Sequence, residues 1–191
     1  VEGSLFVALP GFHVDGHDYI DEAVRRGAGA VLCNRLPEAL SPKVAYAVVP
    51  NTQHALSRAS SAFYSEPSRR LPVVGVTGTD GKSTTVYLID QLLEAVGEEC
   101  GFLSTVARKV DIGVEKNPYR QSTPEAPQIH EALFEMVENG KRFAVLEATS
   151  HGLSEKTGRL MDVVFQAAVF TNITHEHLEF HGTFERYRSD K

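Results

Sequence analysis

The sequence contains no tryptophan and only two cysteines, Cys33 and Cys100, among its 191 residues. Two cysteines are too few for the disulfide framework of a small secreted protein, and they fit a reducing compartment. We expect both to be small, buried, apolar side chains. The chain also lacks an apolar run long enough to span a membrane and a signal-peptide pattern at its start. We therefore expect a cytoplasmic protein without membrane insertion.

An excess of positive charge is missing as well. The chain has 19 Lys and Arg against 25 Asp and Glu, a formal net charge of −6, which argues against nonspecific binding of nucleic acid or anionic membranes. We expect no nucleic-acid partner, and we expect a monomer. With 42% hydrophobic and 23% charged residues, the composition is globular, and the length is compatible with one or two domains.

A phosphate-binding loop is predicted at residues 73–85, which read Val-Val-Gly-Val-Thr-Gly-Thr-Asp-Gly-Lys-Ser-Thr-Thr. The β-branched run 73–77 predicts a buried strand, and the leucines after residue 85 predict a helix. Between them lies a glycine-containing turn, whose N–H groups can bind phosphates at the helix N-terminus. Lys82 would neutralise the outer phosphates, and the Ser83 hydroxyl would bind Mg²⁺. The residues predicted to bind ATP are Gly78, Thr79, Asp80, Gly81, Lys82, Ser83 and Thr84.

Strands and helices alternate on both sides of this loop. Strands are predicted at 5–9, 30–33 and 45–49, with helical patterns from Tyr19 and from Asn51, the latter with Phe63 on its apolar face. This alternation indicates an α/β layer structure. Residues 66–70 break the pattern, so we place a boundary between a first domain, 1–70, and a second domain, 71–191. No starting Met precedes the first strand, and Lys191 ends a helical segment, so we expect an internal portion of a longer protein.

Candidate metal ligands follow the loop. A helical face within 129–137 is followed by an apolar strand, 143–147, that ends in Glu147, and further strand is predicted at 163–165 and 167–170. An acid at the carboxyl end of such a strand can reach the metal on bound phosphates. His175, His177 and His181 come next; zinc remains possible, but a single histidine serving Mg²⁺ beside a carboxylate fits better, because no cysteine ligand is near.

Several motifs, in this order along the chain, resemble those of the Mur ligases, the ATP-dependent amide-forming enzymes of peptidoglycan synthesis. The loop 78–83 has the spacing of that family, which usually has Asn where this chain has Asp80. The other matching segments are 4–11, 15–18, 27–31, 122–127, 147–152, 170–172 and 175–182. Glu176 stands where the family usually has Asp.

The resemblance implies a small N-terminal uridine-binding α/β domain followed by a P-loop ATPase-type central domain with a mostly parallel sheet, both truncated. It implies a ligase, using ATP and Mg²⁺, that adds a diamino acid to UDP-MurNAc-L-Ala-D-Glu through an acyl phosphate. The run 122–127 favours this third step of the peptide stem over the fourth, which adds D-Ala-D-Ala. Two competing hypotheses stay open, namely a generic P-loop kinase or NTPase and a fragment that only binds its ligands. Diaminopimelate, lysine and ornithine all stay open as the added amino acid.

Residue roles are implied by the same resemblance. The catalytic positions are Lys82, Glu147, His177 and Lys191. The metal ligands are Ser83, Glu147 and His177, with Lys191 as a carbamate. The positions matching the uracil contacts are Phe12, His13 and Val14. The peptide contacts are Gln121, Ser122, Thr123, Thr149 and Arg159, of which Arg159 matches the family only if a small insertion is allowed.

Overall fold

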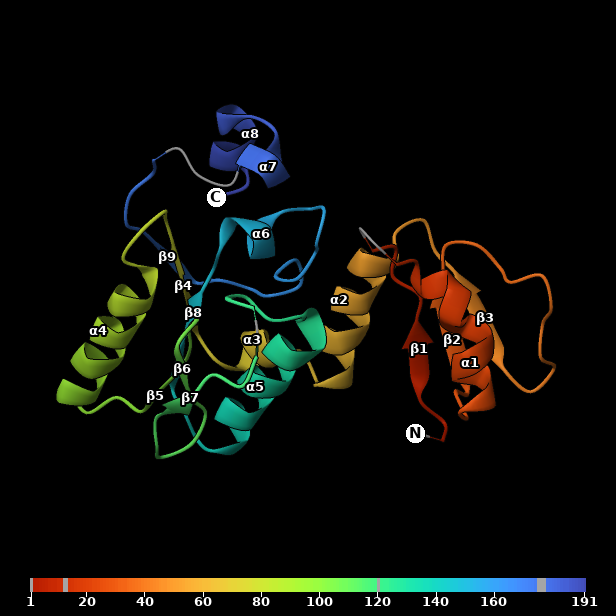
Figure 1. Cartoon of the computed structure of the whole chain (residues 1–191). Coiled ribbons are helices and arrows are strands. Elements are labelled where there is room, and N and C mark those ends of the chain that lie inside the picture. The colour runs from red at the N-terminus through yellow and green to blue at the C-terminus, as the bar shows by residue number, and fades with distance from the viewer. Residues whose placement is uncertain (1, 12–13, 120, 175–177) are drawn as a thin grey trace. The chain divides into compact units, whose positions relative to one another are not determined.

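The computed structural model describes residues 2–11, 14–119, 121–174 and 178–191. The chain divides into two compact units, Val1–Leu56 and Ser57–Lys191, and the division falls within the helix α2 (Thr52–Phe63) (Figure 1). The predicted domain boundary between residues 70 and 71, placed at the break in pattern over residues 66–70, stays a prediction.

The first unit is a three-stranded parallel sheet in the order β1-β2-β3. Its strands are β1 (Leu5–Val7), β2 (Ala30–Cys33) and β3 (Ala45–Val48). A 3₁₀ turn, η1 (Gly16–Tyr19), and the helix α1 (Ile20–Arg25) connect β1 to β2. Ile20 packs against Val31 and the buried Cys33 in the core of this unit, so the apolar positions of helix and strand share one interior.

The second unit contains a six-stranded sheet in the order β7-β6-β5-β8-β4-β9. Its strands are β4 (Val73–Thr77), β5 (Cys100–Leu103), β6 (Ala107–Lys109), β7 (Glu115–Lys116), β8 (Phe143–Glu147) and β9 (Ala167–Phe170). Strands β5, β8, β4 and β9 are parallel, and β6 and β7 add an antiparallel edge. The mostly parallel sheet expected for this part of the chain is therefore confirmed.

Helices cover both faces of this sheet (Figure 1). Val86 of α4 (Lys82–Ala95) packs on Val76 and Val145, whereas Leu133 of α5 (Ala126–Glu138) packs on Val73 and other residues of the opposite face. Since successive strand residues point to opposite faces, the buried strands must be apolar on both sides. The short helices are α3 (Pro67–Arg70), α6 (Ser150–Leu153), α7 (Leu178–His181) and α8 (Phe184–Ser189).

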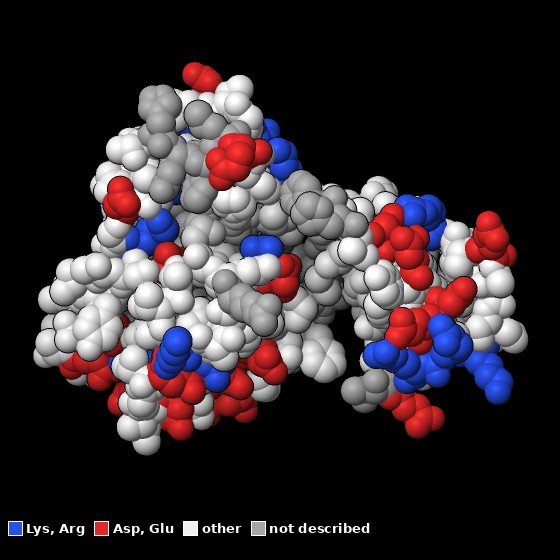
Figure 2. Space-filling view, in the orientation of Figure 1, with Lys and Arg blue, Asp and Glu red and all other residues white. Residues whose placement is uncertain are grey.

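Strand register brings four loops together at one edge of the sheet. Val76 lies opposite Glu147, Thr77 opposite Phe170, and Leu103 opposite Leu146. The carboxyl ends of β4, β5, β8 and β9 therefore lie side by side, which is where open α/β sheets bind their ligands. Among the described residues, no helix is long and apolar enough to cross a membrane. On the face that Figure 2 displays, acidic and basic side chains are interspersed.

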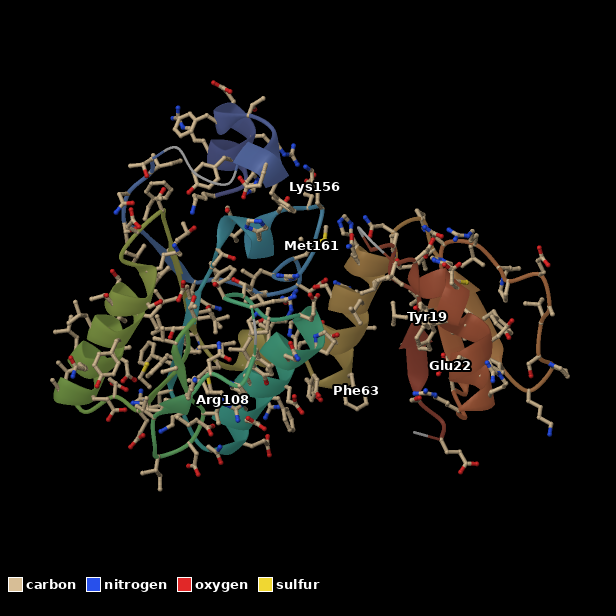
Figure 3. All side chains as sticks on the ribbon, viewed as in Figure 1. Tyr19, Glu22, Phe63, Arg108, Lys156 and Met161 are labelled. Atoms are coloured by element: carbon tan, nitrogen blue, oxygen red, sulfur yellow. The ribbon has the colours of Figure 1, made fainter. Side chains whose placement is uncertain are left out.

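Two local predictions are wrong. Residues 163–165 do not form a strand, because the N–H of Val163 bonds to Leu160 in a turn and that of Val164 bonds to the Ser68 hydroxyl. Pairing with β4 begins only at Ala167. Phe63 was expected on an apolar helix face, yet it is 80% exposed at the end of α2 (Figure 3). The break at residues 66–70 also contains the single-turn helix α3.

His130 on α5 is a buried histidine without a hydrogen-bond partner for either ring nitrogen among the described residues. Burial disfavours the charged ring and lowers the pKa of His130 to about 4 from the usual 6.5, against a smaller opposing effect of Asp162. The folded state therefore holds the neutral ring. The stability that the neutral His130 ring contributes is complete above the pKa of His130 in the unfolded state. It is lost as the pH falls from about 6.5 towards 4, because the unfolded state then binds a proton that the folded state does not.

We predict that His130→Leu weakens the acid sensitivity of the fold. Between neutral pH and a pH of about 4, the wild type should lose about 3 kcal/mol more of its unfolding free energy than the variant. Urea denaturation at a series of pH values measures this difference. Equal pH dependence of the two proteins would show that His130 is not buried as the neutral ring.

Candidate functional site

The phosphate loop connects β4 to α4, and its two glycines have backbone conformations that other residues rarely adopt. Gly78 has a φ of +144° and Gly81, at the N-cap of α4, a φ of +80°. A Cβ atom on Gly78 would also lie 1.9 Å from the Thr171 hydroxyl oxygen. Gly78 is thus required both by its conformation and by the close approach of the segment that follows β9.

That segment holds the loop in place. The Thr79 N–H donates to the Asn172 carbonyl at 2.9 Å, and the Asp80 N–H donates to the Asn172 side-chain oxygen at 3.0 Å. The Thr171 hydroxyl donates to the Asp80 carbonyl at 2.7 Å. These bonds use the backbone of Asp80, and its side chain is exposed, so a carboxylate at this position is compatible with the loop.

Glu147, at the end of β8, is 5% exposed and accepts three hydrogen bonds. The Ser83 hydroxyl donates to one carboxylate oxygen at 2.7 Å, and the Thr105 N–H donates to the same oxygen at 2.8 Å. The Thr105 hydroxyl donates to the other oxygen at 2.9 Å. Thr105 lies just after β5, and Ser83 lies at the start of the helix that follows β4. The segments after β4 and β5 therefore both donate hydrogen bonds to the carboxylate at the end of β8. Nothing in the local sequence singled out Thr105.

Glu147 and Thr105 line a cavity of about 160 Å³ at the carboxyl edge of the sheet. Its lining residues are Gly78, Lys82, Thr105, Ser122, Glu147, Thr149, Ser150, Tyr187 and Lys191. The Lys82 ammonium donates to the Thr79 carbonyl at 2.5 Å, whereas the Lys191 ammonium donates to the Gly78 carbonyl and lies 4.9 Å from the centre of the Tyr187 ring. Two cations and one carboxylate thus face a small space beside the phosphate loop.

The pair formed by Ser83 and Glu147 fits a magnesium ion. Adjacent ligands of an octahedral Mg²⁺, each about 2.0–2.1 Å from the metal, are roughly 2.9 Å apart. The Ser83 Oγ and Glu147 Oε2 atoms lie 2.7 Å apart, so a small shift would let both bind one ion. The predicted ligand His177 lies outside the described residues. Within the described part of the chain, no group of three His, Cys, Asp or Glu could hold a metal.

The predicted peptide contacts are arranged in two layers. Ser122 and Thr149 line the cavity, whereas Thr123 is 2% exposed and its hydroxyl lies 2.8 Å from that of Thr149. Arg159 donates to the Thr123 carbonyl at 3.1 Å and forms an ion pair with Glu125 at 2.7 Å. Arg159 and Thr123 therefore build the wall behind Thr149. Gln121 is exposed, and its contact with a substrate stays a prediction, as do those of the other four.

In the first unit, Phe12 and His13 lie outside the described residues. Val14 is 54% exposed, and Asp15 follows it with an ordered set of polar contacts. Asp15 accepts from the His17 N–H at 2.9 Å, from the His17 ring at 2.6 Å and from Arg35 at 2.6 Å. These hydrogen bonds hold the pKa of Asp15 well below its usual range, and the bond from the His17 backbone N–H has the largest effect. The bond to Arg35 anchors Asp15, the residue after Val14, to the segment after β2.

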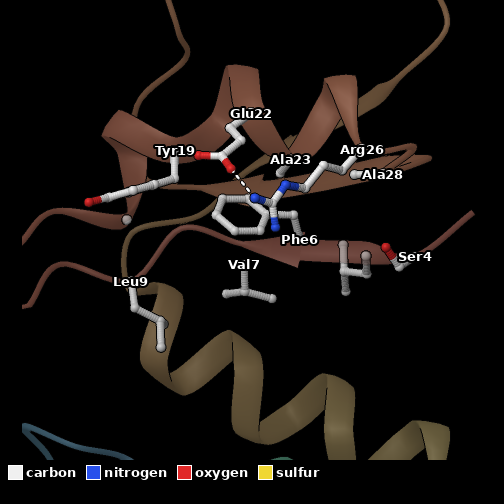
Figure 4. A pocket seen from close by; sticks show the side chains of 11 residues that line it. Ser4, Phe6, Val7, Leu9, Tyr19, Glu22, Ala23, Arg26 and Ala28 are labelled. Atoms are coloured by element: carbon white, nitrogen blue, oxygen red, sulfur yellow. Dashed lines mark ion pairs between the residues drawn. The ribbon is translucent and has the colours of Figure 1, made fainter. Parts of the chain in front are cut away.

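The first unit also has a larger, apolar cavity of about 620 Å³ between β1 and α1 (Figure 4). Phe6, Leu9 and Tyr19 line it, and an ion pair between Glu22 and Arg26 lies at its border. None of these residues was predicted as a site residue.

Two family models match the chain. One, the Mur ligase middle domain, matches residues 76–191, and the other, the Mur ligase family catalytic domain, matches residues 1–64. The chain belongs to the Mur ligase family. The resemblance seen in the motifs is therefore confirmed, and the phosphate loop and the Glu147 strand lie within the region matched by the middle domain.

Curated Mur ligases resemble this chain over almost all of its length. It is 50% identical to a UDP-N-acetylmuramyl-tripeptide synthetase of Borreliella burgdorferi, over 98% of this chain and 37% of the relative. It is 41% identical to a UDP-N-acetylmuramoyl-L-alanyl-D-glutamate–2,6-diaminopimelate ligase of Geobacillus thermodenitrificans, over 99% of this chain and 37% of the relative. The chain thus spans little more than a third of the length of these relatives.

Solved structures support the same fold. A structure of a UDP-N-acetylmuramoyl-L-alanyl-D-glutamate–2,6-diaminopimelate ligase matches with a TM-score of 0.78 at 29% identity, covering 100% of this chain and 38% of that one. A MurF ligase of Thermotoga maritima, in complex with ADP, matches with a TM-score of 0.65 at 27% identity. The match covers 99% of this chain and 39% of that one. Both parts of the Mur ligase α/β fold expected from the sequence are confirmed.

We predict that Gly78→Ala destabilises the protein more than Gly140→Ala. Both glycines have positive φ, but a Cβ atom on Gly140 meets nothing within 4 Å. The control should cost about 1 kcal/mol for the backbone alone, whereas Gly78→Ala adds a steric clash of about 1–3 kcal/mol. Urea unfolding of both variants measures this. Equal losses would mean that Thr171 does not approach Gly78 closely.

Proposed function

We propose that this chain is the N-terminal and partial central region of an ATP-dependent ligase, of the acid–amino-acid type, that acts in peptidoglycan synthesis. The full protein would join a diamino acid to UDP-MurNAc-L-Ala-D-Glu and release ADP and phosphate. The observation that carries the proposal is the meeting of Glu147, Lys82 and Lys191 in one cavity beside the phosphate loop, with the Ser83 hydroxyl bonded to Glu147. The 50% identity to a tripeptide synthetase supports the choice of substrate.

The chemistry starts from a carboxylate, which is a poor acyl donor. Transfer of the terminal phosphate of ATP to the D-glutamyl carboxylate gives an acyl phosphate, and attack by an amine then expels phosphate and forms the amide. Each partner of the first step is anionic, so the site must offset negative charge. Lys82 and the N–H groups at the start of α4 would bind the phosphates, whereas Ser122 and Thr149, which line the cavity, would donate hydrogen bonds to the acceptor carboxylate.

Mg²⁺ would be held by Ser83 and Glu147, and it would supply positive charge that offsets the negative charge of the reacting groups. We also propose His177 and a carbamate of Lys191 as ligands. The Lys191 ammonium would lose one proton to give the neutral amine, which would combine with CO₂ and lose a second proton, so that a cation in the cavity becomes an anionic oxygen donor. The place of the Lys191 ammonium in the cavity that contains Glu147 supports this role.

The first unit would bind the uridine end of the substrate through Phe12, His13 and Val14. The bonds of Asp15 to His17 and Arg35 support this proposal, because they hold the residue that directly follows Val14. Substrate contacts by Gln121, Thr123 and Arg159 and a bound Mg²⁺·ATP complete the proposed site. We further propose that the protein is a cytoplasmic monomer. The similarity to the MurF structure keeps the fourth-step ligase as the second candidate.

The proposal predicts that Lys82→Ala abolishes most ligation by the full-length protein. Loss of the charge at the phosphates should lower turnover at least about 100-fold, because this contact strengthens as negative charge develops in the transition state. Phosphate release is measured with UDP-MurNAc-L-Ala-D-Glu and, in turn, diaminopimelate, lysine and ornithine, and the amide product is quantified. Lys116→Ala on the exposed strand β7 is the control and should retain full activity.

Near-normal turnover of Lys82→Ala would contradict the assignment of the phosphate loop. Phosphate release without an amide product, with every amino acid, would favour a kinase or NTPase over a ligase.

A further inference from the structure

A buried chain of hydrogen bonds joins three residues that no motif had connected: Ser150, His181 and Asp190. The His181 Nδ1 atom lies 2.8 Å from the Asp190 carboxylate, and its Nε2 atom lies 3.1 Å from the Ser150 hydroxyl oxygen. The side chain of His181 is fully buried, and that of Asp190 is 5% exposed. Since a carboxylate only accepts hydrogen bonds, Nδ1 carries the proton towards Asp190 and Nε2 is left to Ser150.

These hydrogen bonds connect the cavity wall to the segment that ends in Lys191. Ser150 lines the cavity from the start of α6, and Asp190 immediately precedes Lys191 after α8. Figure 1 shows α7 and α8 beside α6 at this edge of the sheet. Histidine suits the connection, because its two ring nitrogens point in opposite directions and can serve two partners at once.

A second contact fixes the same segment to the phosphate loop. The Tyr187 hydroxyl lies 2.9 Å from that of Thr79, and the Tyr187 ring packs edge-on against the His181 ring, with centroids 5.2 Å apart. Tyr187 is fully buried. With Thr79 and Ser150 as the two attachment points, the backbone that carries Lys191 has a defined position relative to both the phosphate loop and α6.

We propose that His181 is a positioning residue that acts through Lys191. This inference rests on the proposed function, because it assigns to His181 the placement of the group that the ligase reaction requires. Lysine has a long, flexible side chain, so the position of its ammonium or carbamate depends on where the backbone is held. Without the His181 bridge, Asp190 loses one of its partners, and the buried Ser150 hydroxyl loses its link to α8.

The experiment is a double-mutant cycle in the full-length protein. His181→Asn preserves a donor near Nδ1 for Asp190, His181→Gln preserves a polar group near Nε2 for Ser150, and His181→Phe removes both. Each is combined with Lys191→Ala, and kcat, the KM for ATP and the melting temperature are measured. Arg188→Gln, an exposed residue on the same helix α8, is the matched control and should equal the wild type.

We expect His181→Phe to lower kcat about 10- to 100-fold, the range typical of residues that orient metal-site ligands, and to leave the KM for ATP within about twofold. His181→Asn and His181→Gln should fall between. If His181 acts through Lys191, its substitution should cause no further loss in Lys191→Ala, because the two effects share one cause. Acetate should restore part of the activity of Lys191→Ala. The restored fraction should be the same whether or not His181 is also replaced, because a free carboxylate does not depend on the position of the backbone at residue 191.

Multiplicative losses in the double variants would overturn the inference, since a merely structural His181 lowers activity with or without Lys191. Full activity of His181→Phe or of Lys191→Ala would overturn it too, while ligation by the wild type would leave the proposed function standing. If the wild type makes no amide, the proposed function itself fails. Should His181→Phe not fold, Ser150→Ala removes the bond at Nε2 alone and completes the same cycle.

Discussion

Glu147 is a charged side chain in a buried place, and the arrangement of the candidate site follows from the need to satisfy it. A buried carboxylate is costly unless hydrogen bonds or cations compensate for its lost hydration. Ser83 from α4 and Thr105 after β5 supply three such bonds. Because parallel strands end at one edge of the sheet, β4, β5 and β8 can bring these residues together without any long loop.

The loops at that edge are also fastened to one another. Thr171 and Asn172 after β9 bind the backbone of the phosphate loop, and Tyr187 binds its Thr79 hydroxyl. His181 connects the same C-terminal segment to Ser150. Under the proposed function, a phosphate and a carboxylate would react within this site, and such a reaction needs fixed surroundings because a small displacement of the reacting groups lowers the rate steeply. The site is therefore shaped by bonds between loops.

Local patterns were enough to predict the strand, turn and helix of the phosphate loop, the strand that ends in Glu147 and most other strands, because each depends on neighbours within a few residues. Thr105 and Ser150 were missed, since their partners Glu147 and His181 lie 42 and 31 residues away in the sequence. The pair of His181 with Asp190, nine residues apart, was missed because no standard spacing reveals it. Residues 163–165 have strand-like composition, yet the Ser68 hydroxyl and a turn take their N–H groups. His130 fitted the apolar helix face by position, but nothing in the sequence indicated that its ring stays unpaired.

The central claim is that the phosphate loop and Glu147 serve the activation of a carboxylate and not phosphate transfer to water or a hydroxyl. The most direct measurement follows oxygen. UDP-MurNAc-L-Ala-D-Glu labelled with ¹⁸O in its D-glutamyl carboxylate is turned over by the full-length protein with ATP and a diamino acid, and the released phosphate is analysed by mass spectrometry. An acyl phosphate transfers one labelled oxygen from the carboxylate to phosphate, so we expect one ¹⁸O per phosphate released. Phosphate released without label would contradict the account.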